Sequence, residues 1–387
     1  MKNFILIYLT NFFIATNFYL LMVTISSFAM DYFAASPSQG GLACSLFVIG
    51  ALFARLFSGQ LVERVGNKHT LVFGLGLNLV MSTLYFAVGG LGSLYAVRFL
   101  HGVGFGFSST VAGAIVANYL PQERFGEGIA VFMLSITLAT ALGPFLGMLL
   151  LNTGDHTLLF FCNVAFISLG FAMSFLLTQT ESPPPENPPP APAGPMWIEA
   201  FIATGAVPIS LFCGLAYMCY SSLMSFLLSY ARDIGLVRAA GFFFLLYSAA
   251  ILLSRPFAGR IMDKKGDNFV IYPGIAIYAV GMFILSGARH GAAILLAGAL
   301  IGLGYGALQS SGQTIALKSV PPHRRALGAG TCLMFCDLGT GIGPYIFGLF
   351  ISLAGYRPMY FGVACFILVT ALLYHGLHGR KHRRPGG

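Results

Sequence analysis

The sequence has very little charge. Asp, Glu, Lys and Arg together make up 9% of its 387 residues, whereas hydrophobic residues make up 57%. The mean hydropathy is +0.82. A chain of this composition has too few polar side chains to cover a water-soluble fold, so soluble classes of protein are excluded. The composition predicts an integral membrane protein.

The seven cysteines show no regular spacing, and each lies in or beside an apolar run. We therefore expect small buried hydrophobic residues, with neither a disulfide framework nor a metal site. The formal net charge of +9 could indicate a nucleic-acid ligand. However, the basic residues fall in alternate inter-helix loops and at the C-terminus, so we expect no nucleic-acid partner.

Groups for catalysis and cofactor binding are also lacking. No His/Asp/Glu cluster and no Ser–His pair has a spacing suited to catalysis, which argues against an enzyme. The Gly-x-Gly-x-Gly runs at 102–106 and 302–306 follow no strand and lie inside apolar runs. They are not dinucleotide-binding fingerprints, and we expect no cofactor.

The sequence contains an internal repeat. The stretch from Arg55 to Lys68 recurs from Arg255 to Asn268, at an offset of 200 residues and with no gap. The same offset relates the two Gly-x-Gly-x-Gly runs. It also relates Gly143-Pro144 to Gly343-Pro344. The chain is therefore an internal repeat of one structural unit.

Each copy contains six apolar runs of the length that crosses a bilayer, about 20 residues. We predict spans at 4–30, 40–62, 70–89, 93–118, 127–151, 157–179, 201–229, 240–262, 270–288, 291–316, 327–352 and 358–377. The fold class is therefore all-α, with twelve transmembrane helices as two six-helix bundles in direct repeat.

The predicted domains are a bundle at 1–180, a proline-rich linker at 181–198, a second bundle at 199–379 and a basic tail at 380–387. The prolines exclude a helix from the linker. Most lysines and arginines lie on one side of the predicted spans, and the other side has only Arg232, Arg238, Arg289 and Arg357. The positive-inside rule then places both termini and the linker in the cytoplasm.

The repeated stretch resembles the loop signature of the major facilitator superfamily, which reads roughly Gly-x-Leu-x-Asp-Arg-x-Gly-Arg-Lys. The first copy matches it at Gly59, Leu61, Arg64, Gly66 and Lys68, with Glu63 in place of Asp. The second keeps Gly259, Asp263 and Gly266. Two such copies, each after the second span of its half, make the resemblance specific, and it covers nearly the whole chain.

The resemblance implies a gating role for these two loops. Gly59 would let a neighbouring helix approach closely, Gly66 would form a tight turn, and Glu63 would pair with an Arg or cap a helix. The alternative is a topology anchor, which explains the basic residues but not the glycines and acids.

Deeper in the spans, the residues Arg55, Arg255 and Asp337 are also candidates for gating or proton binding. Asp337 is the only acid deep inside a predicted span. The family packs its second helix against its eleventh, so we predict an Arg55–Asp337 pair that opens when Asp337 binds a proton. A static pair is the alternative.

Arg98-Phe-Leu-His101-Gly is similar to the superfamily's fourth-helix motif, in which an Arg precedes a glycine-rich run. Arg98 and His101 are three residues apart and share a helix face. The family places its fourth helix beside the central cavity, which implies that Arg98 contacts substrate or relays protons. A histidine such as His101 can titrate near neutral pH, which makes it a second candidate. The alternative is that both residues only pack and bond within the bundle.

Gly143-Pro144 resembles the fifth-helix signature of exporters in the superfamily, and Gly343-Pro344 repeats it. Proline bends a helix and glycine allows close crossing, so a packing kink alone would also explain both copies.

The spans that line the cavity in this family are the first, fourth, seventh and tenth. Here they carry aromatic, hydroxyl and amide side chains, which suit an amphipathic organic molecule. The candidates for substrate contact are Asn17, Tyr217, Tyr220, Tyr305 and Gln309. Other polar residues of these spans include Asn11, Thr24, Ser108 and Ser221.

We therefore predict a monomeric secondary transporter of the bacterial inner membrane that exports a small organic molecule in exchange for protons. The resemblance extends to bacterial drug and metallophore exporters. Three buried arginines against one buried aspartate favour an anionic or zwitterionic substrate. The alternatives are a proton-coupled importer of a sugar or organic acid, and a membrane sensor. A sensor would need a soluble signalling domain, and ten residues follow position 377.

Overall fold

The computed structural model describes residues 2–120, 125–151, 153–178, 202–321 and 324–380, and these are helical almost throughout. The long helices are α1 (Lys2–Phe33), α2 (Pro37–Leu84), α3 (Leu91–Tyr119), α4 (Phe125–Leu151), α5 (His156–Phe175), α7 (Val207–Asp233), α8 (Val237–Lys265), α9 (Asn268–Ser286), α10 (Gly291–Lys318), α11 (Arg325–Ala354) and α12 (Tyr356–Tyr374). Short turns of other helix types are η1 (Tyr85–Ala87), η3 (Thr204–Ala206) and η5 (His375–Gly379).

Within the described residues, eleven helices are long and apolar enough to cross a membrane. One of them, α2, has 48 residues and would be about 72 Å long if straight, more than twice the thickness of a bilayer core. Gly66 divides it, because its φ of 83° and ψ of 164° are not helical. The two arms of α2 are therefore the second and third spans, and the prediction of twelve spans is confirmed.

Several helix ends differ from the predicted boundaries, including the two that flank the predicted linker. The sixth span ends at Phe175 rather than at 179, and the seventh begins at Val207 rather than at 201. Pro208 occupies the first turn of α7, where its missing amide donor costs nothing, so it fixes the start of the helix. The predicted linker at 181–198 lies outside the described residues.

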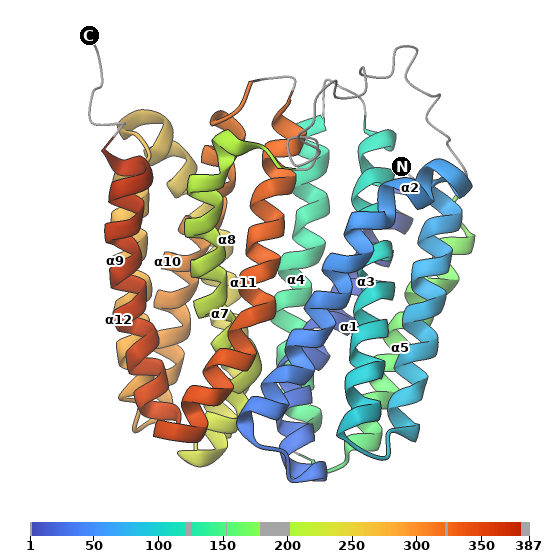
Figure 1. The fold of residues 1–387 in the computed structure, drawn as a ribbon, viewed down its shortest axis with the longest axis horizontal. Coiled ribbons are helices and arrows are strands. Elements are labelled where there is room, and N and C mark those ends of the chain that lie inside the picture. Colours follow the sequence, from blue (N-terminus) through green and yellow to red (C-terminus); the bar gives the residue numbers. More distant parts are fainter. Residues whose placement is uncertain (1, 121–124, 152, 179–201, 322–323, 381–387) are drawn as a thin grey trace. The chain divides into compact units, whose positions relative to one another are not determined.

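The chain divides into two units by its internal contacts. The first contains α1 to α5, coloured blue to green in Figure 1. The second contains the helices from η3 onward, except that Met224–Ser229 of α7 groups with the first. Each unit is a helical bundle in which helices distant in sequence lie side by side, such as α1 with α4 and α9 with α12.

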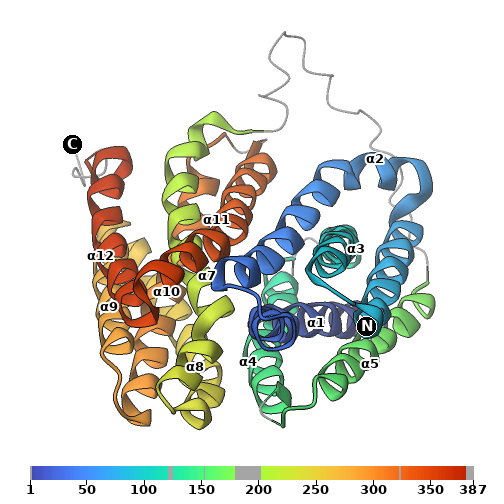
Figure 2. The ribbon, with the colours of Figure 1, turned by 60° about the horizontal axis from the view of Figure 1, so that its bottom comes forward.

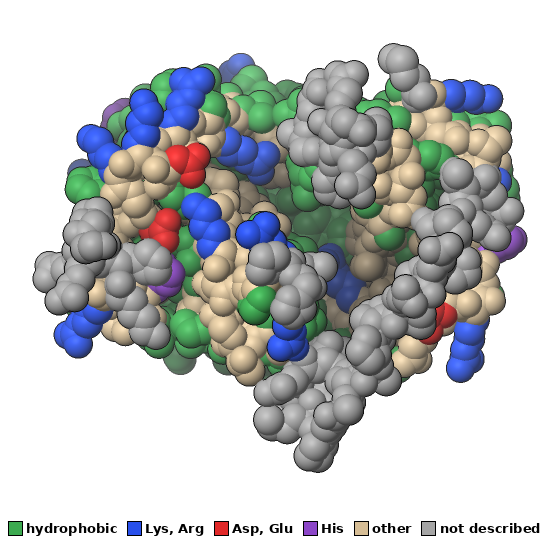
Figure 3. All heavy atoms as spheres, turned by 90° about the horizontal axis from the view of Figure 1, so that it is seen from above, with side chains coloured by type: hydrophobic (Ala, Val, Ile, Leu, Met, Phe, Trp, Pro, Cys, Tyr) green, Lys and Arg blue, Asp and Glu red, His purple; other side chains and the backbone are tan. Residues whose placement is uncertain are grey.

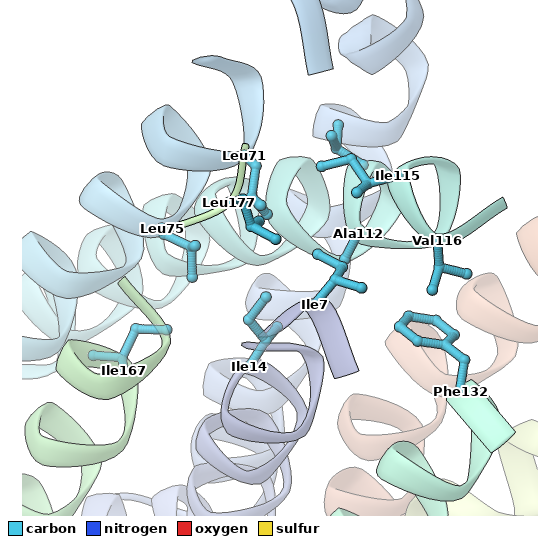
Figure 4. Packing of buried hydrophobic residues seen from close by; sticks show 11 residues of the cluster. Ile7, Ile14, Leu71, Leu75, Ala112, Ile115, Val116, Phe132, Ile167 and Leu177 are labelled. Atoms are coloured by element: carbon cyan, nitrogen blue, oxygen red, sulfur yellow. The ribbon is translucent and has the colours of Figure 1, made fainter. Parts of the chain in front are cut away.

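The first unit has a hydrophobic core that draws on all five of its long helices. Figure 4 shows apolar side chains from α1, α2, α3, α4 and α5 pointing toward one another. The most deeply buried are Ile7, Ile14, Leu71, Leu75, Ala112, Val116 and Ile167. Because lipid tails are as apolar as these side chains, close packing rather than exclusion of water holds such helices together.

Glycines bring α3 against both arms of α2. A Cβ added at Gly102 would collide with the backbone of Phe47, and one added at Gly104 would lie 2.8 Å from the amide nitrogen of Asn78. Figure 2 shows α3 end-on between the two arms. In the second unit, Gly302 and Gly304 meet Tyr247 and Tyr278 in the same way. The two Gly-x-Gly-x-Gly runs are therefore helix-packing motifs.

The expectation that every cysteine is buried was wrong for Cys365, which is exposed on α12. An apolar run in a membrane presents one face to lipid, so an apolar neighbourhood in the sequence does not imply burial within the protein.

Candidate functional site

Arg98 lies in the first third of α3 and is fully buried. Its Nε donates to the carbonyl oxygen of Ala43 at 2.9 Å, and its Nη1 donates to the hydroxyl of Tyr85 at 3.3 Å. The guanidinium carbon lies 4.4 Å from the centre of the Phe47 ring. These contacts come from neutral groups on α2 and η1, so the charge is stabilised by dipoles and a π face.

Tyr85 connects Arg98 to His101, which is also fully buried. The Tyr85 hydroxyl lies 2.9 Å from Nδ1 of His101. Since that oxygen accepts a hydrogen bond from Arg98, its own proton is directed at Nδ1. Nε2 of His101 faces the side-chain oxygens of Asn78 and of Asn17, the latter at 3.1 Å. Oxygen acceptors at Nε2 require a proton there, so this arrangement selects the neutral Nε2–H tautomer.

The network continues to α5. The side-chain nitrogen of Asn17 donates to the side-chain oxygen of Asn163 at 2.7 Å, and Asn163 is fully buried. The network therefore runs from Arg98 through Tyr85, His101 and Asn17 to Asn163. It ties α1, both arms of α2, α3 and α5 into one body. The side-chain nitrogens of Asn78 and Asn163 are buried and have no hydrogen-bond partner among the described residues.

The sequence placed Arg98, His101 and Asn17 on candidate helices, and the structure brings all three together. It missed three partners. Asn78 lies in the third span, Tyr85 lies at the end of that span, and Asn163 lies in the sixth span. The expectation considered only the spans that line the cavity in the family. Asparagine inside an apolar run was the available signal, because an amide in a membrane needs a polar partner.

Several other polar residues of the predicted cavity-lining spans are satisfied locally. Thr24, Ser108 and Ser221 each donate to a carbonyl three or four residues earlier in the same helix. Asn11 donates to Ser135 at 2.8 Å, which links α1 to α4. These groups have structural partners within their own unit.

The second unit holds a cluster of tyrosines where the first holds the Arg98 network. Tyr220 stacks on Tyr305 with ring centres 4.5 Å apart and an interplanar angle of 21°. Tyr247 and Tyr278 also contact Tyr305. Gln309 donates to the hydroxyl of Tyr217 at 2.7 Å. The four sequence candidates of this unit are therefore neighbours, and Tyr217 and Gln309 are its half-buried members.

The tyrosine cluster offers aromatic faces and hydroxyl groups on adjoining helices. Tyr278 is fully buried, and its hydroxyl has no hydrogen-bond partner in the part of the chain that the structure describes. Stacked rings with a few hydroxyl and amide groups form a surface that accepts flat or amphipathic organic molecules.

The repeated loops, residues 59–68 and 259–268, adopt the same unusual backbone. Gly66 has φ 83° and Gly266 has φ 91°, and both ψ values lie near 170°. This region is open almost only to glycine. Asp263 lies 3.9 Å from Lys318, although both side chains are largely exposed. Glu63 and Arg64 are exposed as well.

The close helix approach that we expected at Gly59 is not made within the described residues. A Cβ added at Gly59 or at Gly259 meets no atom within 4 Å. The tight contacts are instead made at the Gly-x-Gly-x-Gly runs, because those glycines face a neighbouring helix.

The Gly-Pro pairs lie at helix crossings. A Cβ at Gly143 would lie 2.7 Å from Cβ of Tyr19, so α4 crosses α1 there, and Gly343 faces Met218 and Ser221 of α7 in the same manner. Pro144 and Pro344 lie inside α4 and α11.

Arg55 and Arg255 are half-buried near the ends of their spans, and Asp337 is half-buried in the interior of α11. Arg55 belongs to the first unit and Asp337 to the second. The predicted pair would form between the units and stays a prediction.

Two curated relatives match most of the chain. It is 22% identical to the staphylopine export protein of Staphylococcus aureus, over 89% of this chain and 88% of that protein. It is 24% identical to multidrug resistance protein 1 of Bacillus subtilis, over 95% and 94%. Among solved structures, a bacterial homologue of the human lysosomal transporter Spinster superposes with a TM-score of 0.79. That match has 13% identity and covers 99% of this chain and 98% of that one.

A family model described as Major Facilitator Superfamily matches residues 7–335 and 209–387. These two matches together extend over nearly the entire sequence, and each unit contributes the loop motif that led to the resemblance. The chain is a transporter that belongs to the Major Facilitator Superfamily.

Proposed function

We propose that this transporter exports a small amphipathic organic molecule from the cytoplasm in exchange for protons. The observation that carries the proposal is that the two units have chemically different interiors. The first holds a buried charge in a network of polar side chains, and the second presents clustered aromatic rings and the single deep carboxylate, Asp337.

The direction of transport is supported by two observations. The relatives in Staphylococcus aureus and Bacillus subtilis are named as an exporter and a resistance protein. The Gly143-Pro144 pair, which resembles the exporter signature, also lies at the crossing of α4 and α1. A hinge at this crossing would let α4 change its angle while the glycine keeps the helices close.

Proton coupling is assigned to Asp337. It lies about 18 Å along α11 from the helix start at the normal rise per residue. Every other acid of the described helices lies near a helix end or near Gly66. A carboxyl at this depth exchanges between a protonated form and a form paired with a cation. Arg55 is the cation we propose, and release of that pair would open the cytoplasmic side.

Arg98 and His101 are assigned a different role from the one the resemblance implies. The guanidinium is enclosed by Ala43, Tyr85 and Phe47 and is not exposed to substrate. His101 completes its hydrogen bonds as a neutral ring. We therefore assign both residues to positioning the helices. Because Arg98 then does not contact the substrate, the argument for an anionic substrate becomes weaker.

The orientation that we propose for the protein in the membrane follows from the distribution of its basic side chains. Figure 3 shows one face of the molecule, on which Lys and Arg side chains are prominent. This distribution supports a cytoplasmic location for that face.

Transport into vesicles tests the proposal. Inverted membrane vesicles whose interior is more acidic than the medium should accumulate one or more compounds from a panel of amphipathic dyes and organic acids. Collapse of the gradient should stop accumulation, and Asp337→Asn should remove its dependence on the gradient. Uptake only by right-side-out vesicles would show an importer, and full activity of Asp337→Asn would remove Asp337 from the coupling step.

A further inference from the structure

Each unit ties the end of its last helix to its own repeated loop. In the first unit, the ammonium group of Lys68 lies 3.3 Å from the carbonyl oxygen of Phe175 and also donates to that of Leu177. These carbonyls close the C-terminus of α5, where a cation is favourable because of the helix dipole. The contact joins one lysine to two backbone carbonyl groups, and no histidine takes part in it.

The second unit makes the equivalent contact with different chemistry. Asn268, the repeat counterpart of Lys68, donates to the carbonyl oxygen of Gly379 at 3.1 Å. Beside it, Nε2 of His378 lies 3.2 Å from a carboxylate oxygen of Asp267, and both side chains are only 12% and 11% exposed. One turn earlier, Nδ1 of His375 lies 2.7 Å from the hydroxyl of Tyr272.

The first unit has no titratable counterparts at these positions. By the offset of 200 residues, His375 corresponds to Phe175, His378 to Thr178 and Asp267 to Asn67. The duplication has thus kept the contact and changed its chemistry in one copy. In the second unit, the contacting segment is η5, a π-helical turn. Such turns are uncommon and often mark functional positions.

We propose that Asp267, Asn268, His375 and His378 form a clasp that holds the end of α12 to the second repeated loop and loosens as pH rises through the neutral range. Below, this set of four residues is called the clasp. The imidazolium form of His378 makes an ion pair with Asp267, whereas the neutral ring makes only a weaker hydrogen bond. The clasp is therefore tight in mild acid and loose in mild base.

Other charged or titratable groups surround His378. The ring of Tyr374 lies 5.7 Å from its imidazole, and the hydroxyl of Tyr374 donates to Asn268 at 2.9 Å. Tyr272 on α9 contacts His375, Lys264 and Lys265 end α8 just before Gly266, and the backbone amide of Arg380 donates to the carbonyl oxygen of His375. Asp267 is the acid in contact with His378, which makes this pair the pH-dependent element of the clasp.

The consequence is that one of the two repeated loops responds to the pH on its side of the membrane. Gly266, whose φ of 91° sets the turn, directly precedes Asp267. A loose clasp frees the end of α12 from this turn, while the Lys68 contact, which involves no histidine, continues to hold the end of α5. This regulation does not depend on the direction of transport or on the substrate, so it can fail while the proposed function holds.

Hydrogen exchange of the purified full chain tests the clasp, with mass spectrometry at about pH 6 and about pH 8 after correction for intrinsic exchange rates. The expected result is that protection of the peptide covering 371–380 falls about tenfold between these values, the size of one charge-assisted hydrogen bond. The peptide covering 171–178 in the same sample is the internal control, and its corrected protection should stay constant.

Three variants decide the assignment. His378→Gln and Asp267→Asn should each abolish the pH dependence at 371–380, and Lys68→Met should lower protection at 171–178 equally at both pH values. An unchanged pH dependence in His378→Gln and Asp267→Asn would overturn the proposal. An equal loss of protection at 171–178 in the unmodified chain would overturn it as well, since the effect would then be global.

Discussion

At the scale of single residues, the Tyr85 hydroxyl is the link on which the buried network of the first unit depends. It accepts from Arg98 and faces Nδ1 of His101. Tyr85→Phe keeps the ring and leaves two buried polar groups without a partner. We expect the stability of the chain in detergent to fall by about 2 kcal/mol or more, since each unsatisfied group costs about 1–3 kcal/mol.

Tyr345→Phe is the matched control, because Tyr345 is 42% exposed and its hydroxyl is not enclosed by the protein. Its effect should stay within about 0.5 kcal/mol. The measurement is denaturant or thermal unfolding of both variants under the same conditions. Equal stability of the two variants would show that Arg98 and His101 find other partners.

The residues of this network show where inference from the sequence stops. A buried Arg and a His three residues later were legible as one functional face, because helical spacing is local. Asn78, Tyr85 and Asn163 were not predicted as partners, since nothing local says which spans lie against α3. The Lys68 contact with the end of α5 was missed for the same reason, although the lysine itself was part of the recognised motif.

At the scale of helices, close packing of α3 against α2 predicts a sharp positional effect. Gly102→Ala would place a methyl group in the backbone of Phe47, whereas a Cβ at Gly113 of the same helix meets no atom within 4 Å. We expect Gly102→Ala to destabilise the first unit by about 1–3 kcal/mol through overpacking. Gly113→Ala should be neutral or stabilising by up to about 1 kcal/mol, because alanine favours helix.

Unfolding of the two variants, compared with the unmodified chain, measures this difference. Gly102→Ala and Gly113→Ala are the same substitution in the same helix, so they differ only in the atoms that the added methyl group contacts. A stable Gly102→Ala variant would mean that α2 and α3 separate easily, and the packing role of the Gly-x-Gly-x-Gly runs would have to be abandoned.

The break in α2 makes a second prediction about a helix. Gly66 combines φ 83° with ψ 164°, a region where a Cβ costs of order 1–3 kcal/mol. Gly66→Ala should therefore destabilise the turn by about that amount and reduce transport. Gly59→Ala, in an open helical position, should leave stability unchanged or slightly raised. If both variants lost transport to a similar degree and neither lost stability, the backbone conformation at Gly66 would not explain why glycine is needed there.

Helices themselves were the most predictable level of this structure. The length of each apolar run sets a span, because an unsatisfied backbone cannot cross the bilayer. The break at Gly66 followed from a glycine among charged residues. Within the first unit no helix approaches Gly59 closely, and the approach predicted there stays a prediction, since the motif gives a residue type and not the direction that it faces.

At the scale of the whole molecule, duplication has produced two similar frames with different interiors. By the offset of 200 residues, Asn17 corresponds to Tyr217, Asn78 to Tyr278 and Phe47 to Tyr247. The same positions thus hold a polar network in one unit and an aromatic cluster in the other. One unit is fixed by a dense set of buried hydrogen bonds, and the other presents the surface that we assign to the substrate.

Because glycines and buried networks fix the helices within each unit, transport should move the units as bodies rather than reshape them. Spin labels at Gln60 and Arg260, exposed repeat counterparts in different units, would report this motion after Cys365→Ser removes the exposed native thiol. We expect two distance populations whose balance shifts between about pH 6 and about pH 8 and becomes fixed in Asp337→Asn. A pair within the first unit, Gln60 and Phe175, should give one unchanging distance. If that internal distance shifts as much as the distance between the units, rigid-body alternation is wrong and the helices of the first unit rearrange during transport.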